Sequence, residues 1–136
     1  MMSRATGPFD VKVTPQAPDG VYEDAQLGRL ALDKTFHGDL EATGRGQMLT
    51  GGTHVKGSAG YVAVERVTGT LHGKRGSFVL LHTGTMAHGE FNLSIIVVPD
   101  SGTDELTGLS GKMAIIIEGK AHSYDFEYAI ASSPAS

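Results

Sequence analysis

The segment YVAVERVTGTLHGKRGSFVLLHTG, residues 61–84, contains two runs in which apolar side chains alternate with other residues. A period of two is typical of β-strands, and a short turn bounded by glycines between two such runs is typical of a hairpin. We therefore predict strands at Tyr61–Gly73 and Gly76–Met86, joined by a two-residue turn at Lys74 and Arg75. The segment predicts an antiparallel β-hairpin.

The rest of the chain repeats this pattern, because its 19 glycines lie between short alternating runs and no stretch keeps helical spacing. Apolar faces on this many antiparallel strands must be covered, and the short connections favour an all-β, eight-stranded up-and-down barrel in one domain, residues 1–136. We expect residues 1–7 and 132–136 to be frayed ends. The other predicted strands are Phe9–Gln16, Leu27–His37, Leu40–Leu49, Gly89–Pro99, Thr107–Glu118 and Ala121–Ala131.

Composition excludes several classes of function. The net charge of −4 and the lack of a basic cluster argue against a nucleic-acid partner, and no apolar run is long enough to span a membrane. The chain has no cysteine, and its histidines lack metal-ligand spacing, so we expect no metal and no cofactor. The N-terminus lacks the apolar core of a signal peptide, and we expect a cytoplasmic protein.

The predicted register places two titratable residues side by side on an apolar inner face. With the turn at Lys74 and Arg75, Val67 lies opposite His82, and Glu65 lies opposite Gly84, which leaves open space beside the carboxylate. Glu65 and His82 are then diagonal neighbours within reach of each other. A Glu–His pair in an apolar lumen can act as general acid and base, so these two are the candidate catalytic residues.

Other polar side chains are expected to line the same lumen. Centring the loop before residue 61 near Val55 places Arg45 opposite Glu65, with Gln47 on the same face, where both could orient a ligand. That loop is long and fixes register weakly, so strand 40–49 could also be flipped, with its polar stripe in solvent. The candidate ligand-binding residues are Arg45, Gln47, Tyr61, His122, Tyr124 and Tyr128.

The same residues allow a purely structural interpretation. Buried charged groups in a barrel often satisfy only one another, Arg45 with Glu65 and His82 with a carboxylate or a carbonyl. The loop at residues 99–108 is either a plain turn closing a barrel mouth or a rim over a pocket. A continuous outer apolar patch would suggest a homo-oligomer, and its candidate residues are Val62, Val64, Val79, Leu81, Ile96 and Val98.

The strings GYVAVERVTGTLHGKRGSFVLLHTG, VVPDSGTDELTGLSG and HSYDFEYAI resemble an uncharacterised bacterial domain family whose members look like allene-oxide-cyclase-like barrels. The resemblance covers residues 36–130 and implies the barrel fold but no activity. The wider superfamily includes cofactor-free cyclases and isomerases with a carboxylate in the lumen, which draws attention to Glu65 and His82. The family often has glutamine before the motif histidine, where this chain has Leu81, a residue expected to face outward.

These observations lead to one functional expectation with two alternatives, and whether the protein is an enzyme stays open. We expect a barrel that binds a small apolar molecule in its lumen, as a cofactor-free isomerase or cyclase would. The alternatives are a non-catalytic carrier that uses the same lumen, and a filled structural barrel that acts through oligomerisation.

Overall fold

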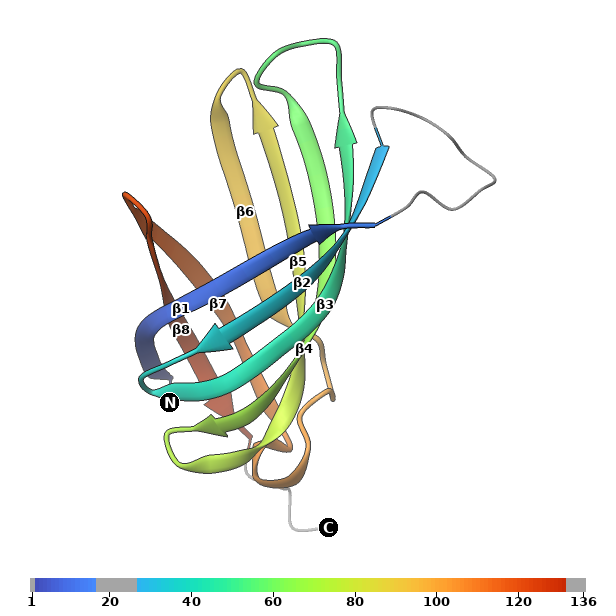
Figure 1. Ribbon diagram of the computed structural model, residues 1–136. Coiled ribbons are helices and arrows are strands. Elements are labelled where there is room, and N and C mark those ends of the chain that lie inside the picture. The colour runs from blue at the N-terminus through green and yellow to red at the C-terminus, as the bar shows by residue number, and fades with distance from the viewer. Residues whose placement is uncertain (1, 17–26, 132–136) are drawn as a thin grey trace.

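The computed structural model describes residues 2–16 and 27–131. Over these residues the strands pair in chain order, each antiparallel to the next, and β1 pairs with β8 to close the sheet (Figure 1). The predicted all-β, eight-stranded up-and-down barrel is confirmed. The elements are β1 (Ser3–Pro15), β2 (Leu27–Phe36), β3 (Leu40–Gly52), β4 (Ala59–Leu71), β5 (Lys74–Ala87), β6 (Glu90–Val97), the short 3-10 helix η1 (Asp104–Leu106), β7 (Leu109–Glu118) and β8 (Ala121–Ile130).

The turn between β4 and β5 lies two residues earlier than the sequence predicted. His72 and Gly73 have φ angles of 47° and 79°, the left-handed geometry that lets a two-residue turn match the twist of its strands. The predicted turn residues Lys74 and Arg75 are the first residues of β5 instead. Histidine adopts positive φ more readily than most residues, and the glycine pattern alone did not reveal this.

Residues 3–7 are part of the barrel, so the expectation that this segment is frayed is wrong for them, and residue 1 lies outside the described residues. Ser3 to Phe9 pair with β8, and Ala5 is fully buried. β1 and β8 can pair because β1 begins as early as Ser3. This pairing removes both open edges of the sheet and satisfies their backbone groups. The other predicted frayed end, residues 132–136, lies outside the described residues.

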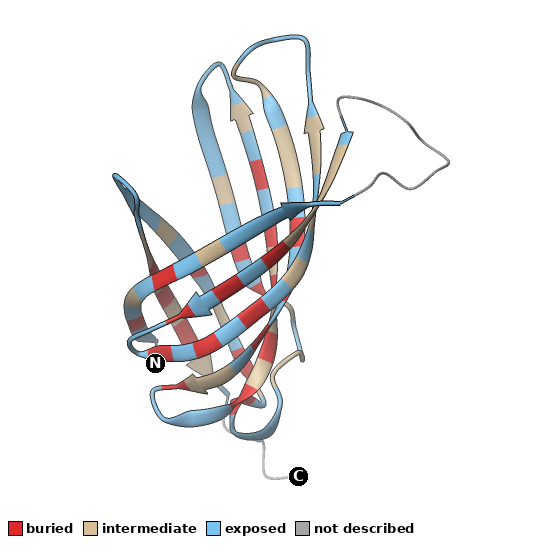
Figure 2. Ribbon diagram, in the orientation of Figure 1, coloured by how far each residue is buried: buried red, intermediate tan, exposed pale blue. Residues whose placement is uncertain are grey.

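One end of the barrel is filled by side chains. Phe78 and Phe126 stack with ring centroids 5.8 Å apart, and Phe36 and Tyr124 are almost fully buried beside them. Leu106, from η1 in the predicted mouth-closing loop, is 1% exposed and belongs to the same core. Buried residues accordingly concentrate in the half of the barrel near the β4–β5 turn (Figure 2). The loop at residues 99–108 therefore closes this end.

The opposite half, which carries the β3–β4 and β5–β6 connections, is open. Its inward-facing apolar side chains remain accessible, with Val13, Phe91 and Ile117 exposed by 43%, 57% and 63%. The wall is also loosest here, because Ile96 and Lys112 are the only pair joining β6 to β7 in the described part of the chain. The barrel is thus a cup, with a packed base and an apolar upper half.

Within the described ranges, none of the helical segments has the length and apolar character needed to cross a membrane.

Candidate functional site

Three titratable side chains are buried at the boundary between the packed base and the open half. Lys34 on β2, Glu65 on β4 and His82 on β5 are 5%, 0% and 3% exposed. Apart from tyrosines, they are the only buried residues with polar or charged side chains in the part of the chain that the structure describes. Burying charge in an apolar interior is costly unless the groups pair, so their arrangement is the first thing to establish.

One oxygen of Glu65 joins the three side chains. Its Oε1 accepts a hydrogen bond from Lys34 Nζ at 2.9 Å and another from His82 Nε2 at 2.6 Å. The predicted contact between Glu65 and His82 is confirmed, although His82 pairs with Ala63 rather than with Val67. That shift of four residues is even, so both side chains keep their predicted face and remain diagonal neighbours.

The surroundings of Glu65 favour its charged form. Burial by itself would raise the pKa of this carboxyl, but the hydrogen bond from His82 and the positive charge of Lys34 outweigh it and lower the pKa below its usual value. Glu65 is therefore a carboxylate at neutral pH, and because a carboxylate only accepts, His82 Nε2 carries the proton of the bond they share. The bond leaves the second ring nitrogen of His82, Nδ1, for another partner.

The second oxygen of Glu65 lies against the backbone of β3. Oε2 is buried and has no hydrogen-bond partner among the described residues. A Cβ atom added at Gly44 would lie 2.4 Å from Oε2 and 3.2 Å from the ring of Phe36. Glycine at position 44 therefore makes the room that the carboxylate occupies.

The prediction that Arg45 and Gln47 line the lumen is wrong. Gly46, not Arg45, lies opposite Glu65, and both predicted side chains are exposed on the outside of the barrel. The register of β3 against β4 differs from the prediction by one residue, which reverses every side chain of β3. The loop that connects the two strands has hydrogen bonds of its own, in which the Thr53 hydroxyl donates to the carbonyl groups of Val55 and Ser58.

Lys34 supplies the positive charge that the sequence assigned to Arg45. Its Nζ also lies 5.4 Å from the ring centre of Phe9 and 5.8 Å from that of Phe36, so two aromatic faces help to hold the charge. The sequence did carry a signal for it. Lys34 stands between Leu32 and Phe36 at the parity that puts their side chains in the core.

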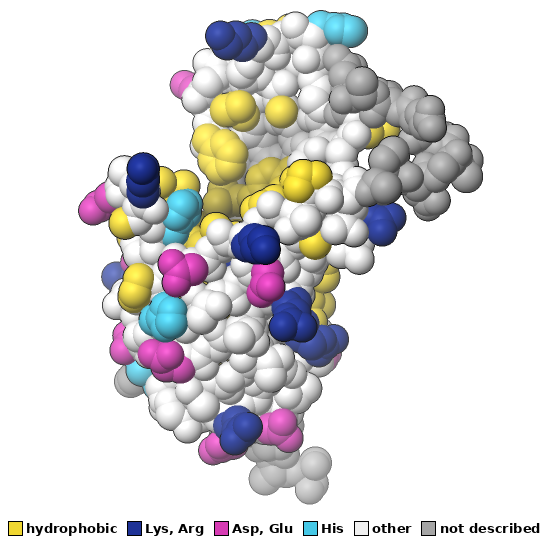
Figure 3. Space-filling view, viewed as in Figure 1, with side chains coloured by type: hydrophobic (Ala, Val, Ile, Leu, Met, Phe, Trp, Pro, Cys, Tyr) yellow, Lys and Arg dark blue, Asp and Glu magenta, His cyan; other side chains and the backbone are white. Residues whose placement is uncertain are grey.

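The open half of the barrel encloses a cavity of about 420 Å³. Lys34 and His82 form part of its wall, whereas Glu65 lies behind them and does not line it. Figure 3 shows a hollow in the surface lined by hydrophobic side chains. Among the apolar residues of the cavity wall are Phe9, Val11, Leu32, Met48, Leu93 and Ile115.

The four predicted aromatic ligand-binding residues fall into two groups. Tyr61 and His122 line the cavity. Tyr124 and Tyr128 point into the packed base instead, where the Tyr124 hydroxyl donates to the His37 carbonyl at 2.6 Å. These two tyrosines hold the base together, because each buried hydroxyl has found a partner inside the protein.

The space predicted beside Gly84 is occupied by Tyr61. The two residues are opposite each other in the β4–β5 ladder, and a Cβ at position 84 would lie 2.3 Å from the Tyr61 ring. Burial, and then the nearby charge of Glu65, raise the pKa of Tyr61. Its hydroxyl is therefore a neutral donor and acceptor at physiological pH.

A family model described as "Protein of unknown function (DUF3224)" matches residues 5–128. The chain belongs to the DUF3224 family. The expected resemblance to an uncharacterised domain family is thereby confirmed. A comparison with curated proteins finds no match.

A solved structure from the DUF3224 family has the same fold. It is the crystal structure of a protein with unknown function from Shewanella oneidensis MR-1, 51% identical in sequence and with a TM-score of 0.91. The match covers 98% of this chain and 100% of that chain. The barrel is thus shared with a DUF3224 protein along almost the whole chain.

Proposed function

We propose that this DUF3224 protein binds a small, largely apolar molecule in the open half of its barrel, and that His82 transfers a proton on that molecule. The supporting observation is the position of a buried Lys–Glu–His cluster at the inner end of an apolar cavity. An apolar cavity with a few convergent polar groups is the usual form of a small-molecule site. The corresponding reaction is a cofactor-free isomerisation or cyclisation.

The roles of the three residues follow from which of them reach the cavity. His82 lines it and has one ring nitrogen that the Glu65 bond does not use, so it is the candidate general acid or base. Glu65 lies behind the wall and acts as a positioning residue that fixes the orientation and proton of the imidazole. Lys34 donates to a polar atom of the ligand.

Binding is tested first by native mass spectrometry of freshly purified protein and by titration with the neutral apolar dye N-phenyl-1-naphthylamine. We expect a co-purified small molecule or dye binding, and at least a roughly tenfold loss of dye affinity when Leu93→Trp fills the cavity. Arg45→Gln, which changes an outward-facing residue, is the matched control and should bind normally. An empty protein that binds no dye would contradict the proposal.

Proton transfer is tested with 2-decanone in D2O, by following deuterium uptake next to the carbonyl with NMR. The wild type should accelerate the exchange, and His82→Gln should lower the rate by about 100-fold, the usual contribution of a general base. Dye binding by the same variant shows that its cavity is intact. Binding of the ketone without accelerated exchange in the wild type would leave a carrier and exclude this catalytic role.

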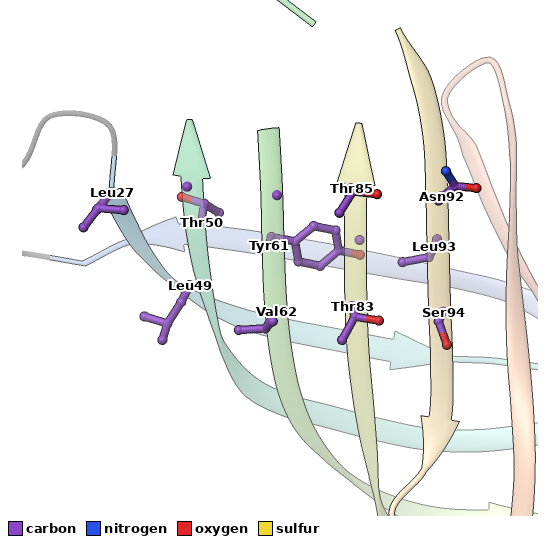
Figure 4. Close-up of a pocket in the computed structure, with 13 residues that line it drawn as sticks. Leu27, Leu49, Thr50, Tyr61, Val62, Thr83, Thr85, Asn92, Leu93 and Ser94 are labelled. Carbon is purple, nitrogen blue, oxygen red and sulfur yellow. The ribbon is translucent and has the colours of Figure 1, made fainter. Parts of the chain in front are cut away.

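The outer face supports a second proposal, that two copies associate through β3–β6. On the outside of the barrel, Leu49 of β3 is exposed by 54%, Val62 and Val64 of β4 by 46% and 51%, and Ile96 of β6 by 41%. Figure 4 shows a pocket beside this patch, in which Leu49, Val62, Thr83 and Ser94 lie in a row across β3, β4, β5 and β6. No charged side chain lines this pocket among the described residues, so a second copy would meet no like charge at the pocket itself.

The association is tested by light scattering coupled to size-exclusion chromatography. We expect a dimer or larger assembly for the wild type and a monomer for Val64→Lys, with unchanged thermal unfolding of the isolated barrel. A wild type that stays monomeric at high concentration would contradict this proposal and leave the lumen proposal untouched.

A further inference from the structure

This inference rests on the proposed binding function. The charges of Lys34 and Glu65 at the inner end of the cavity favour an uncharged ligand. Lys34 is the only Lys, Arg, Asp or Glu among the described residues that line the cavity, and Glu65 behind it balances its charge. A ligand carboxylate would place a second anion beside Glu65 with one lysine to share, which is unfavourable in an apolar site. A cationic ligand would meet Lys34 directly.

The amine of Lys34 is placed to meet such a ligand. One of its N–H groups is held by Glu65 Oε1, while Phe9 and Phe36 lie against it with their ring faces and form no strong hydrogen bond. An ammonium group has three donors, so a ligand carbonyl oxygen at the cavity wall can accept one of them. The carbonyl carbon then lies next to Nζ, among the apolar side chains of the cavity wall.

We propose that Lys34 captures apolar aldehydes or ketones in the cup as a protonated imine. A C–N bond forms between Nζ and the carbonyl carbon, and the C–O bond breaks as the oxygen leaves as water. Two of the three ammonium protons leave with that oxygen, and the third stays on the imine nitrogen. The charge is +1 before and after, so nothing is oxidised or reduced and Glu65 keeps its partner.

The neighbours of Lys34 provide what the capture needs. Glu65 Oε1, already hydrogen-bonded to both Lys34 and His82, accepts the proton that frees the lone pair of Nζ. His82 lines the cavity and can carry a proton to the departing oxygen. The carboxylate then pairs with the imine cation.

The test uses decanal and sodium cyanoborohydride, which reduces an imine to a stable amine, with peptide mapping by mass spectrometry. Decanal should modify Lys34 at least about tenfold faster than any of the exposed lysines, because the cavity holds the aldehyde next to the amine. 1-Decanol, which cannot form an imine, should slow the modification at Lys34 and leave the surface sites unchanged. The exposed reference residues are Lys12, Lys56, Lys74, Lys112 and Lys120.

Two variants and a binding assay make the outcome decisive. Lys34→Arg keeps a cation beside Glu65 but has no primary amine to form the imine, so it should lose the fast modification. Lys112→Arg is the matched surface control and should keep the fast modification. Decanal that displaces the dye but modifies Lys34 no faster than the surface lysines would overturn the capture alone. If neither decanal, 1-decanol nor the dye binds, the proposed function is overturned with it.

Discussion

The substitution Glu65→Gln removes the one anion that holds the buried cluster together. At the observed 2.9 Å, the attraction between Lys34 and Glu65 is about 6 kcal/mol if the effective dielectric constant is about 20. Much of this is offset by the cost of removing both charges from water, so the measurable quantity is the effect of leaving Lys34 unpaired. Breaking a buried pair in this way costs about 3–5 kcal/mol. The amide oxygen can take the place of Oε1, which puts the NH2 group in the place of Oε2, a buried position with no hydrogen-bond partner among the described residues.

The assay is urea unfolding of the wild type and the variant near pH 7, followed by circular dichroism. We expect the free energy of unfolding to fall by about 3–5 kcal/mol. Arg45→Gln, on the outside of the adjacent strand, is the control and should change it by less than about 0.5 kcal/mol. A loss below about 1 kcal/mol for Glu65→Gln would refute the reasoning, because it would mean that water compensates the cluster.

The pH dependence gives an independent check with a definite sign. The pKa of Glu65 is lowered on folding, so the unfolded chain binds a proton at this carboxyl before the folded chain does as the pH falls. The stabilisation is complete above the unfolded value of about 4.3 and is lost as the pH falls through the lower folded value. The difference between wild type and Glu65→Gln should therefore narrow below about pH 4. A difference that grows in acid would contradict the assignment of Glu65 as a carboxylate.

Three further substitutions test the packing around the site by the same unfolding assay. Gly44→Ala should lower the free energy of unfolding by about 1–3 kcal/mol, because its Cβ would lie 2.4 Å from Glu65 Oε2. Gly51→Ala is the control, since no atom lies nearer than 3.8 Å to its added Cβ. Equal effects of the two substitutions would contradict the crowding at position 44. Leu106→Ala should lower the free energy of unfolding by about 2–5 kcal/mol and leave dye binding unchanged. A loss of dye binding would mean that the packed base and the cavity are not independent. Tyr124→Phe removes hydroxyl bonds to buried backbone and should cost about 1–3 kcal/mol; no change would mean that water replaces them.

Alternation along the strands was enough to predict which residues of β4 and β5 face the lumen. The predicted turn was misplaced, yet Glu65 and His82 still faced inward and met, because the register error was even. Their proximity was therefore predictable from two strands and a short turn. Whether either residue acts on a ligand is a separate matter that the proposed experiments address.

The same reasoning failed on β3, because its predicted register against β4 was wrong by one residue, an odd number that reverses the inward and outward faces. The loop before β4 has its own hydrogen bonds, made by the side chain of Thr53, and a loop of that length can join the strands in either parity. Arg45 was consequently assigned to the lumen, and Lys34 on β2 was overlooked. Lys34 alternates with the core residues Leu32 and Phe36. A lysine is rarely buried without a partner of opposite charge, so its burial could be predicted only once Glu65 was known to lie beside it.

The sequence by itself determined the barrel and the inward direction of Glu65 and His82, because the period of two and the glycine turns are local properties of the chain. Only the tertiary structure decided that Lys34 is their partner, that Leu106 closes one end, and that the cavity lies in the other half. These contacts join residues that are far apart in the sequence. They depend on the closure of the barrel by β1 and β8 and on the packing of the loop at residues 99–108 against its base. Local sequence patterns determine whether a side chain points into or out of the barrel, whereas the closed barrel determines which residues it contacts.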